Sequence, residues 1–312
     1  MSVADFHGGR GSVSLAAAVL ISMLAGLARA DGAAEPAAVE GTETRRWRRQ
    51  ASENFELRAQ GTAAELSELS AALEAQLTQL HDAWSIDRSG PRWQPRCQVF
   101  VHATRAAYIA AAGPGSERTN GSSLVHFDRG QVVGRRIDLD GVRSDWQTET
   151  MPHELTHVVL ADEFPHGRLP RWADEGAAML ADSPLKRARH RQDAQSARKR
   201  GGELSVAQLL NIEQPLAAGR MAAFYGQSLT LVEHLVAQGD RRRFLDFLHE
   251  ADRAGYDASL RTHYGLASPA RLAVAFEPSE ARRGPQLTGF SGQTPASVLR
   301  AQRASRAAAV QH

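Results

Sequence analysis

The residues with the clearest chemical potential lie in one short segment, His153-Glu154-Leu155-Thr156-His157. On a helix, positions i and i+4 lie on the same face, so the imidazoles of His153 and His157 would stand side by side. Two imidazole nitrogens at this spacing are typical of a zinc site, and Glu154 is placed to act as a base toward an attacking water. The segment therefore predicts two metal ligands and one catalytic base.

A catalytic zinc site needs a third protein ligand, and the next helical segment offers one. Pro170 suits the first turn of a helix that carries Trp172 and Glu175. Residues 162–169 are long enough to reverse the chain, so the two helices can run antiparallel. Glu175 could then reach the metal held by His153 and His157.

This pair of motifs resembles the gluzincin metallopeptidases, specifically the small peptidase MA-like families of exported bacterial proteins. The likeness rests on His-Glu-x-x-His followed by Trp172-x-x-Glu175-Gly176, and it extends more weakly over most of residues 54–276. It implies a Zn²⁺ cofactor held by His153, His157 and Glu175, with Glu154 as the catalytic base. It also implies that the strand around 136–140 is the sheet edge against which an extended peptide lies.

A later helix adds a second candidate catalytic residue, Tyr225. The segment beginning at Phe224 resembles the helix that follows the site in those families, where a tyrosine hydroxyl often donates to the substrate oxygen that becomes negative. Tyr225 also shares an apolar stripe with Leu229 and Val232, which is typical of a core tyrosine. Both roles remain open from the sequence.

The chain departs from the family pattern at one position. Many gluzincins carry a carboxylate four residues after the third ligand, which orients a metal-bound histidine, but this chain has Met179 there. A ligand histidine usually donates its second N–H to an acceptor. Glu149, one turn before His153, is the favoured replacement, with Asp182 or a backbone carbonyl as alternatives.

The elements that must position these residues divide the chain into two halves. Alternating or continuous apolar patterns predict strands in the first half, and 3.6-residue periodicity predicts a helix over 66–84 and further helices after Gly141. The strands are expected at 54–59, 97–102, 124–127 and 136–140; the later helices at 147–163, 170–182, 205–211, 221–238, 241–250, 256–264 and 268–276. This predicts an α+β fold, with a small mixed sheet and its helices first and an all-helical half second. The resemblance implies that the fold is zincin-like, with the zinc site between the two halves.

Composition excludes several function classes. Of the 312 residues, 42% are hydrophobic and 23% are charged, as in an ordinary globular protein. The net charge of +2 argues against a nucleic-acid partner bound through bulk charge. The single cysteine, Cys97, excludes an internal disulfide and a Cys-based zinc site.

The N-terminus predicts export. A basic residue, an apolar run from Leu15 to Leu27 and the small-residue end Ala28-Arg29-Ala30 have the form of a signal peptide cleaved after Ala30. We therefore expect a periplasmic or extracellular protein with no stable membrane insertion after cleavage. Residues 31–53 are expected to be a linker, 54–276 the peptidase domain (strand-rich over 54–145, helical over 146–276), and 277–312 a poorly ordered tail.

These features favour an exported zinc metallopeptidase acting on a peptide or protein substrate. The alternative from a different class is a non-catalytic binding or scaffolding protein that keeps the zinc helices as a structural staple. A weaker third hypothesis is a cell-envelope hydrolase that acts on a non-peptide amide. An intact Glu154 favours the enzyme.

Overall fold

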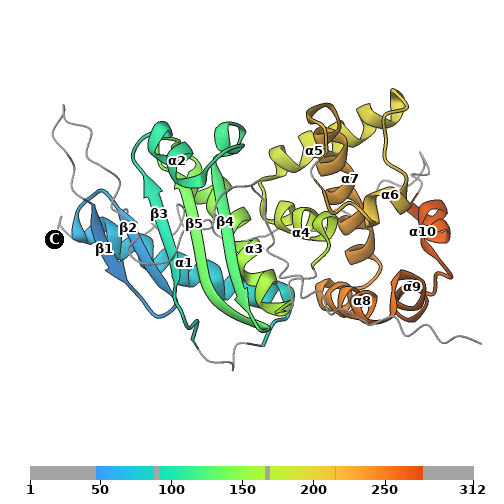
Figure 1. Cartoon of the computed structure of the whole chain (residues 1–312), viewed down its shortest axis with the longest axis horizontal. Helices are drawn as coiled ribbons and strands as arrows, with labels where there is room; N and C mark the ends of the chain where they lie inside the picture. Colours follow the sequence, from blue (N-terminus) through green and yellow to red (C-terminus); the bar gives the residue numbers. More distant parts are fainter. Residues whose placement is uncertain (1–46, 88–91, 166–168, 215, 277–312) are drawn as a thin grey trace, which may run out of the picture.

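The computed structural model describes residues 47–87, 92–165, 169–214 and 216–276, with the strands in the first half and only helices after residue 146 (Figure 1). The α+β division expected from the sequence is therefore confirmed. The expected signal peptide and the expected C-terminal tail lie outside the described residues, as does most of the expected linker.

A five-stranded mixed sheet forms the first half, in the order β1-β2-β3-β5-β4. Its strands are β1 (Arg48–Ala51), β2 (Phe55–Ala59), β3 (Cys97–His102), β4 (Gly121–Asp128) and β5 (Gln131–Asp140). Strands β2, β3 and β5 are parallel, while β1 and β4 pair antiparallel with their neighbours. Strand β1 lies within residues 31–53, where only a linker was expected. It pairs with β2 over four residues, too short a run for a pattern to be visible.

The expectation that the strand at 136–140 is a sheet edge is wrong. Strand β5 pairs with β3 on one side and β4 on the other, so β4 is the edge strand. Ile137 and Leu139 are completely buried on one face, as the alternation predicts. Asp138 and Asp140 are also buried on the other face, because ion pairs with Arg136 and Arg105 compensate their charges. Charged residues in this strand therefore do not indicate an exposed edge.

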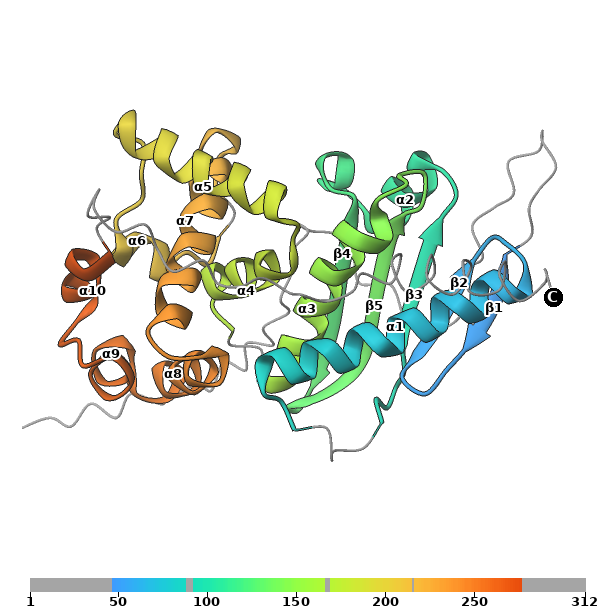
Figure 2. The same ribbon diagram turned by 180° about the vertical axis from the view of Figure 1, so that it is seen from behind.

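Two helices cover one face of the sheet, as Figure 2 shows. Helix α1 (Ala63–Trp84) packs against β1, β2 and α3 (Met151–Glu163), and α3 packs against β4 and β5. The N-terminus of α1 is closed by a capping box between Thr62 and Glu65. The short helix α2 (Arg105–Ala112) contacts β3 and β5. This packing holds α3, with its two histidines, between the sheet and the helical half.

The second half contains helices α4 (Arg171–Ala178), α5 (Pro184–Lys199), α6 (Val206–Leu210), α7 (Ala218–Ala237), α8 (Arg241–Ala254), α9 (Tyr256–Tyr264) and α10 (Pro269–Phe276). Helix α5 was not predicted, since its sequence has no apolar stripe and only Ala197 is fully buried. It forms because Ser183 caps it and because Gly226 of α7 lets the α5 backbone approach closely at His190. None of the helices in the described residues is long and apolar enough to span a membrane.

Candidate metal centre

Helices α3 and α4 bring together the three residues expected to bind zinc. One ligand atom from each of His153, His157 and Glu175 lies within 4.8 Å of the others. The Nε2 atoms of the two histidines are 3.3 Å apart. Two nitrogens at about 2.0–2.1 Å from a tetrahedral zinc ion would be about 3.3 Å apart. The spacing therefore fits a shared metal ion, and two nitrogens with one carboxylate oxygen are a suitable donor set for zinc.

The burial of α3 leaves this group open on one side only. Leu155, Val158 and Val159 are almost completely buried on the face away from the histidines, so the helix is interior, as its sequence predicts. His157 and Glu175 are also buried, whereas the His153 side chain keeps 15% of its exposure. A substrate can therefore approach from the His153 side.

Each histidine has a carboxylate on its other ring nitrogen. The Nδ1 atom of His157 lies 2.7 Å from Asp174 Oδ1, and that of His153 lies 3.1 Å from Asp182 Oδ1. Because a carboxylate accepts hydrogen bonds, each Nδ1 donates to its carboxylate, and Nε2 is the nitrogen that can bind a metal when it displaces the proton from the ring. Both imidazoles are thus oriented with Nε2 toward the metal group.

The carboxylate partners differ from the favoured expectation. Glu149 does not contact His153; its Oε2 atom accepts a hydrogen bond from the backbone N–H of Ser183 at 3.4 Å. Asp182, the less favoured alternative, takes that place because the chain turns back after α4 through the 3₁₀ turn Met179–Ala181. Asp174 was missed, although an acidic residue directly before a metal-ligating glutamate was a visible signal.

The electrostatics of the site favour a bound cation. Burial alone would lower the pKa of His157, but the Asp174, Glu175 and Glu154 carboxylates outweigh it and raise the pKa to about 10. Burial raises the pKa of Glu175 in turn, against the opposing effect of the two histidines. The negative charge gathered around the imidazoles attracts a positive ion, and a metal dication satisfies this requirement.

Glu154 lies where α3 meets the start of the edge strand. A Cβ atom on Gly121, the first residue of β4, would fall 2.7 Å from Glu154 Oε1 and 2.5 Å from Thr150 Cγ2. Only glycine therefore allows the strand to pass the Glu154 side chain. As a result, the edge strand begins directly beside the candidate catalytic base.

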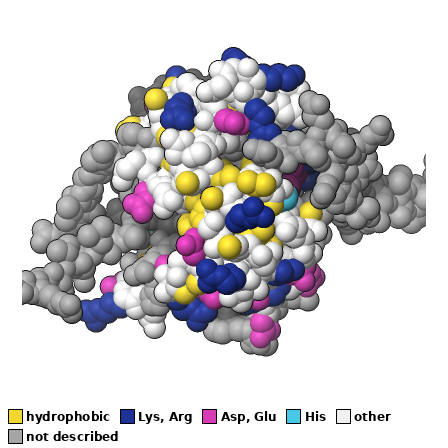
Figure 3. Space-filling model, turned by 90° about the vertical axis from the view of Figure 1, so that its right-hand side faces the viewer, with side chains coloured by type: hydrophobic (Ala, Val, Ile, Leu, Met, Phe, Trp, Pro, Cys, Tyr) yellow, Lys and Arg dark blue, Asp and Glu magenta, His cyan; other side chains and the backbone are white. Residues whose placement is uncertain are grey.

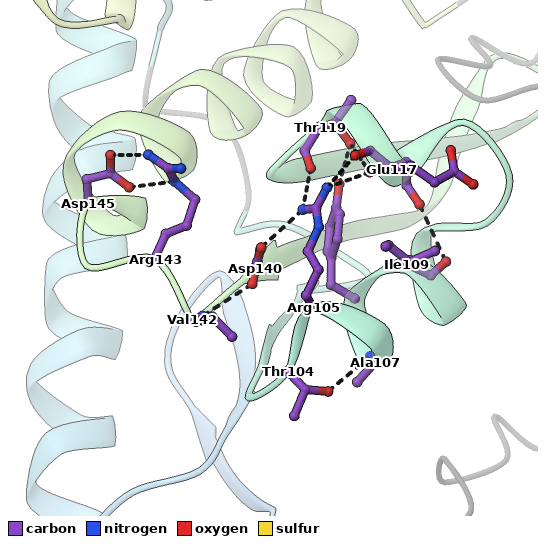
Figure 4. A network of polar contacts seen from close by, with 12 residues as sticks. Thr104, Arg105, Ala107, Ile109, Glu117, Thr119, Asp140, Val142, Arg143 and Asp145 are labelled. Atoms are coloured by element: carbon purple, nitrogen blue, oxygen red, sulfur yellow. Dashed lines mark hydrogen bonds and ion pairs between the residues drawn. The ribbon is translucent and has the colours of Figure 1, made fainter.

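A polar network fixes the chain just before β4 (Figure 4). The Arg105 guanidinium donates to Asp140 Oδ2 at 3.0 Å and to the carbonyl oxygens of Ser116, Glu117 and Thr119. The N–H of Asp140 donates to the carbonyl of Asn120 at 2.9 Å. Since β5 leads on to α3, the network ties the beginning of the edge strand to the segment that carries the histidines.

Tyr225 of α7 lies close to the metal group. Burial raises the pKa of its hydroxyl well above its ordinary value, with further contributions from the negative charges of Glu175 and Glu154. The hydroxyl therefore keeps its proton and can act as a donor. Leu229 and Val232, on the same stripe, are completely buried, whereas Tyr225 is only partly buried. The tyrosine stands at the margin of the core, facing charged groups.

Two further residues near the site were not singled out in the sequence. Arg171, one turn before Glu175 on α4, opposes the effect of burial on the pKa of both Glu175 and Tyr225. His190 of α5 has its ring 6.3 Å from that of Tyr225 and its Nε2 3.9 Å from Asp182 Oδ2. His190 could not be found from spacing, because α5 itself had no recognisable pattern.

Comparison with known proteins agrees with this geometry. Residues 119–270 match a family model described as the Peptidase MA superfamily. The matched region includes the edge strand, both helices of the metal group and the helix of Tyr225. The comparison with curated proteins found no significant match. Residues 119–270 therefore form a Peptidase MA superfamily domain.

Proposed function

We propose that this protein is an exported zinc-dependent peptidase. The observation that carries the proposal is the pair of Nε2 atoms 3.3 Å apart, each on a ring whose other nitrogen is held by a carboxylate. Glu175 completes the donor set from α4. A structural zinc site would have all four positions closed by protein, whereas this group offers three ligands and an exposed side.

The residues around the group have separate roles in the proposed hydrolysis. Zinc, when bound, supplies Lewis-acid polarisation of the scissile carbonyl and of the attacking water. Glu154 takes the proton from that water and delivers it to the leaving amine. The Tyr225 hydroxyl donates a hydrogen bond to the carbonyl oxygen as negative charge develops on it.

The substrate binds along β4 in this proposal, and not along β5. An edge strand presents unpaired backbone N–H and C=O groups, to which an extended peptide can add as a further strand. Gly121 places the first residue of that edge against Glu154. A peptide paired with β4 would therefore pass the candidate base with its backbone oriented.

Export is proposed from the sequence of residues 1–30, with its apolar run and small-residue end. N-terminal sequencing of the protein secreted by its native host would test it. A mature chain that begins at Asp31 is expected; a chain that retains residues 1–30 in the cytosol would contradict export.

Metal analysis combined with a cleavage assay tests the enzymatic proposal. The purified mature protein should contain about one zinc per chain. It should cleave members of a peptide library, lose this activity to a chelator and regain it when zinc is added. A protein that binds zinc but exchanges no water at the metal and cleaves no peptide would be the scaffolding protein instead.

A further inference from the structure

Arg171 occupies a position from which it can act on a substrate. It is the first residue of α4, one helical turn before Glu175 and therefore on the same face. Its guanidinium lies 4.9 Å from the centre of the Phe224 ring, and Phe224 directly precedes Tyr225. Its Nη1 atom donates to the carbonyl of Gln214 at 3.3 Å. These contacts hold a permanent positive charge beside the metal group.

This charge is not neutralised by an ion pair. The two aspartates of the site have other partners: Asp174 accepts from His157, and Asp182 accepts from His153 and Lys186. Across the described ranges, no carboxylate forms an ion pair with Arg171. Its contacts are the Phe224 ring, the carbonyl of Gln214 and the Tyr225 hydroxyl, all uncharged, and its side chain is only partly buried. A guanidinium with free donors is a fork that fits a carboxylate in two hydrogen bonds.

The positive charge continues along the neighbouring helix. Helix α5 carries six basic residues, including both lysines of the chain, and one acidic residue, although the whole chain has a net charge of only +2. Lys186 reaches the metal centre through Asp182, at 2.8 Å. Arg187, Arg189 and Lys199 form no ion pair within the part of the chain that the structure describes. In Figure 3, basic side chains lie along the upper edge of the molecule, the level of α5 in Figure 1.

We propose that the substrate is a peptide with a carboxylate close to the scissile bond, and that Arg171 binds this carboxylate. The carboxylate comes either from the end of the peptide or from an Asp or Glu side chain. The surplus charge of α5 strengthens the attraction of acidic peptides to this side of the site. This inference rests on the proposed peptidase function and defines the class of its substrate.

Matched peptides test the inference. Each sequence cleaved in a library is prepared as a free acid, as a C-terminal amide, and with Glu or Asp replaced by Gln or Asn. The form with the required carboxylate should have a kcat/KM roughly 10- to 100-fold higher than its neutral counterpart, as expected for hydrogen bonds to a charged group. The acid and amide forms identify a chain-end carboxylate, and the side-chain replacements identify an acidic residue.

Variants assign the effect to Arg171. Arg171→Gln should abolish the preference, chiefly because the KM for the acidic peptide rises to that of its neutral counterpart. Arg171→Lys should restore part of it, because lysine keeps the charge but not the fork. Arg253→Gln, an exposed residue of α8, is the matched control and should keep the full preference.

Peptide affinity for the zinc-loaded Glu154→Gln protein can be measured without turnover. Isothermal titration with the same peptides should show tighter binding of the acidic forms. Equal affinity for acidic and neutral forms, or a preference that survives Arg171→Gln, would overturn the inference. If the preference survives Arg171→Gln but disappears when Arg187, Arg189 and Lys199 are replaced by Gln, the substrate carboxylate is bound by α5. That result would contradict its assignment to Arg171. If no peptide is cleaved, the peptidase proposal fails, and isothermal titration with acid and amide forms of uncleaved library peptides then decides whether Arg171 binds carboxylates.

Discussion

Two histidine–carboxylate pairs in this protein have the same N···O distance but different surroundings. In the metal centre, His157 Nδ1 lies 2.7 Å from Asp174; in the sheet, His102 Nε2 lies 2.7 Å from Asp138. Both histidines are buried. The free nitrogen of His157 faces a second imidazole 3.3 Å away, whereas the Nδ1 atom of His102 is buried without a hydrogen-bond partner in the described structure.

The neighbours explain the difference. Asp138 is shared with Arg136, whose Nε atom lies 2.6 Å from it, and the His102 ring packs among Trp47, Phe100 and Tyr108. The sheet pair is therefore an enclosed hydrogen-bonded pair that ties β3 to β5, and Arg136 balances the charge of its carboxylate. A histidine–carboxylate pair becomes a metal site only where its remaining nitrogen converges with other donors toward an open side.

The largest expected effect is on catalysis, and it comes from Glu154, which belongs to neither pair. Glu154→Gln should retain zinc and the fold while kcat falls about 10²- to 10⁴-fold, because the general base is lost. His102→Gln, the control from the sheet pair, should retain zinc and full kcat. The checks are zinc content, melting temperature and initial rates on a cleaved peptide. An active Glu154→Gln protein would show that another residue is the base.

Tyr225→Phe should have the next largest effect. Removal of one donor to the developing oxyanion costs about 100- to 1,000-fold in kcat, or about 2.7–4 kcal/mol of transition-state stabilisation. Zinc content and melting temperature should hardly change. Tyr108→Phe is the control, since Tyr108 is completely buried and its hydroxyl contacts Thr119 Oγ1 at 2.6 Å. Unchanged turnover together with lower stability would make Tyr225 a core residue like its stripe neighbours.

Substituting the two aspartates compares the pairs directly. Asp174→Asn should weaken zinc affinity about 10- to 100-fold, because the carboxylate orients the ligand His157. Asp138→Asn should leave zinc affinity unchanged and lower the free energy of unfolding, since it leaves the Arg136 charge without its partner. Competition with a chromophoric chelator measures the first effect, and urea unfolding measures the second. Equal loss of zinc affinity in both variants would remove the distinction between the pairs.

The smallest effect is a pH dependence in the sheet pair. Burial would raise the pKa of Asp138, but hydrogen bonds from His102 and Arg136 outweigh it and hold the pKa below its usual value. A carboxyl group with a lowered pKa in the folded state contributes stability above its unfolded pKa of about 3.9, and this contribution is lost as pH falls through the folded value. The stability difference between wild type and Asp138→Asn should therefore shrink below about pH 4 in urea titrations. A difference that stays constant from pH 7 to pH 3 would contradict this.

Local sequence patterns predicted a large part of the fold. The continuous apolar run of 97–102, the alternation of 136–140 and the leucine stripe of 66–84 appear as β3, part of β5 and α1. Each pattern depends only on which sides of one element face the core. The i, i+4 spacing brought His153 and His157 together for the same reason, since one helix contains both. Patterns of this kind do not require knowledge of the neighbouring elements.

Other features depended on contacts between distant segments. Helix α5 has no stripe and forms against α7, where Gly226 admits its backbone. Strand β1 is explained by its pairing with β2. The resemblance implied that 136–140 is an exposed edge, but β4 pairs with β5 on that side, and ion pairs with Arg105 and Arg136 balance its buried aspartates. In each case the decisive partner lies in another element, and the periodicity of a single segment carries no information about such contacts.

For the site, the sequence by itself determined which side chains can bind the metal and the α+β division that carries them. Only the tertiary structure decided that Asp174 and Asp182, and not Glu149, hold the imidazoles, that β4 is the free edge, and that Arg171 stands beside Glu175 without a carboxylate partner in the described part of the chain. The physical reason is that a ligand set within one or two helices follows from helical geometry. Hydrogen-bond partners, strand order and uncompensated charge are set by how separate elements pack.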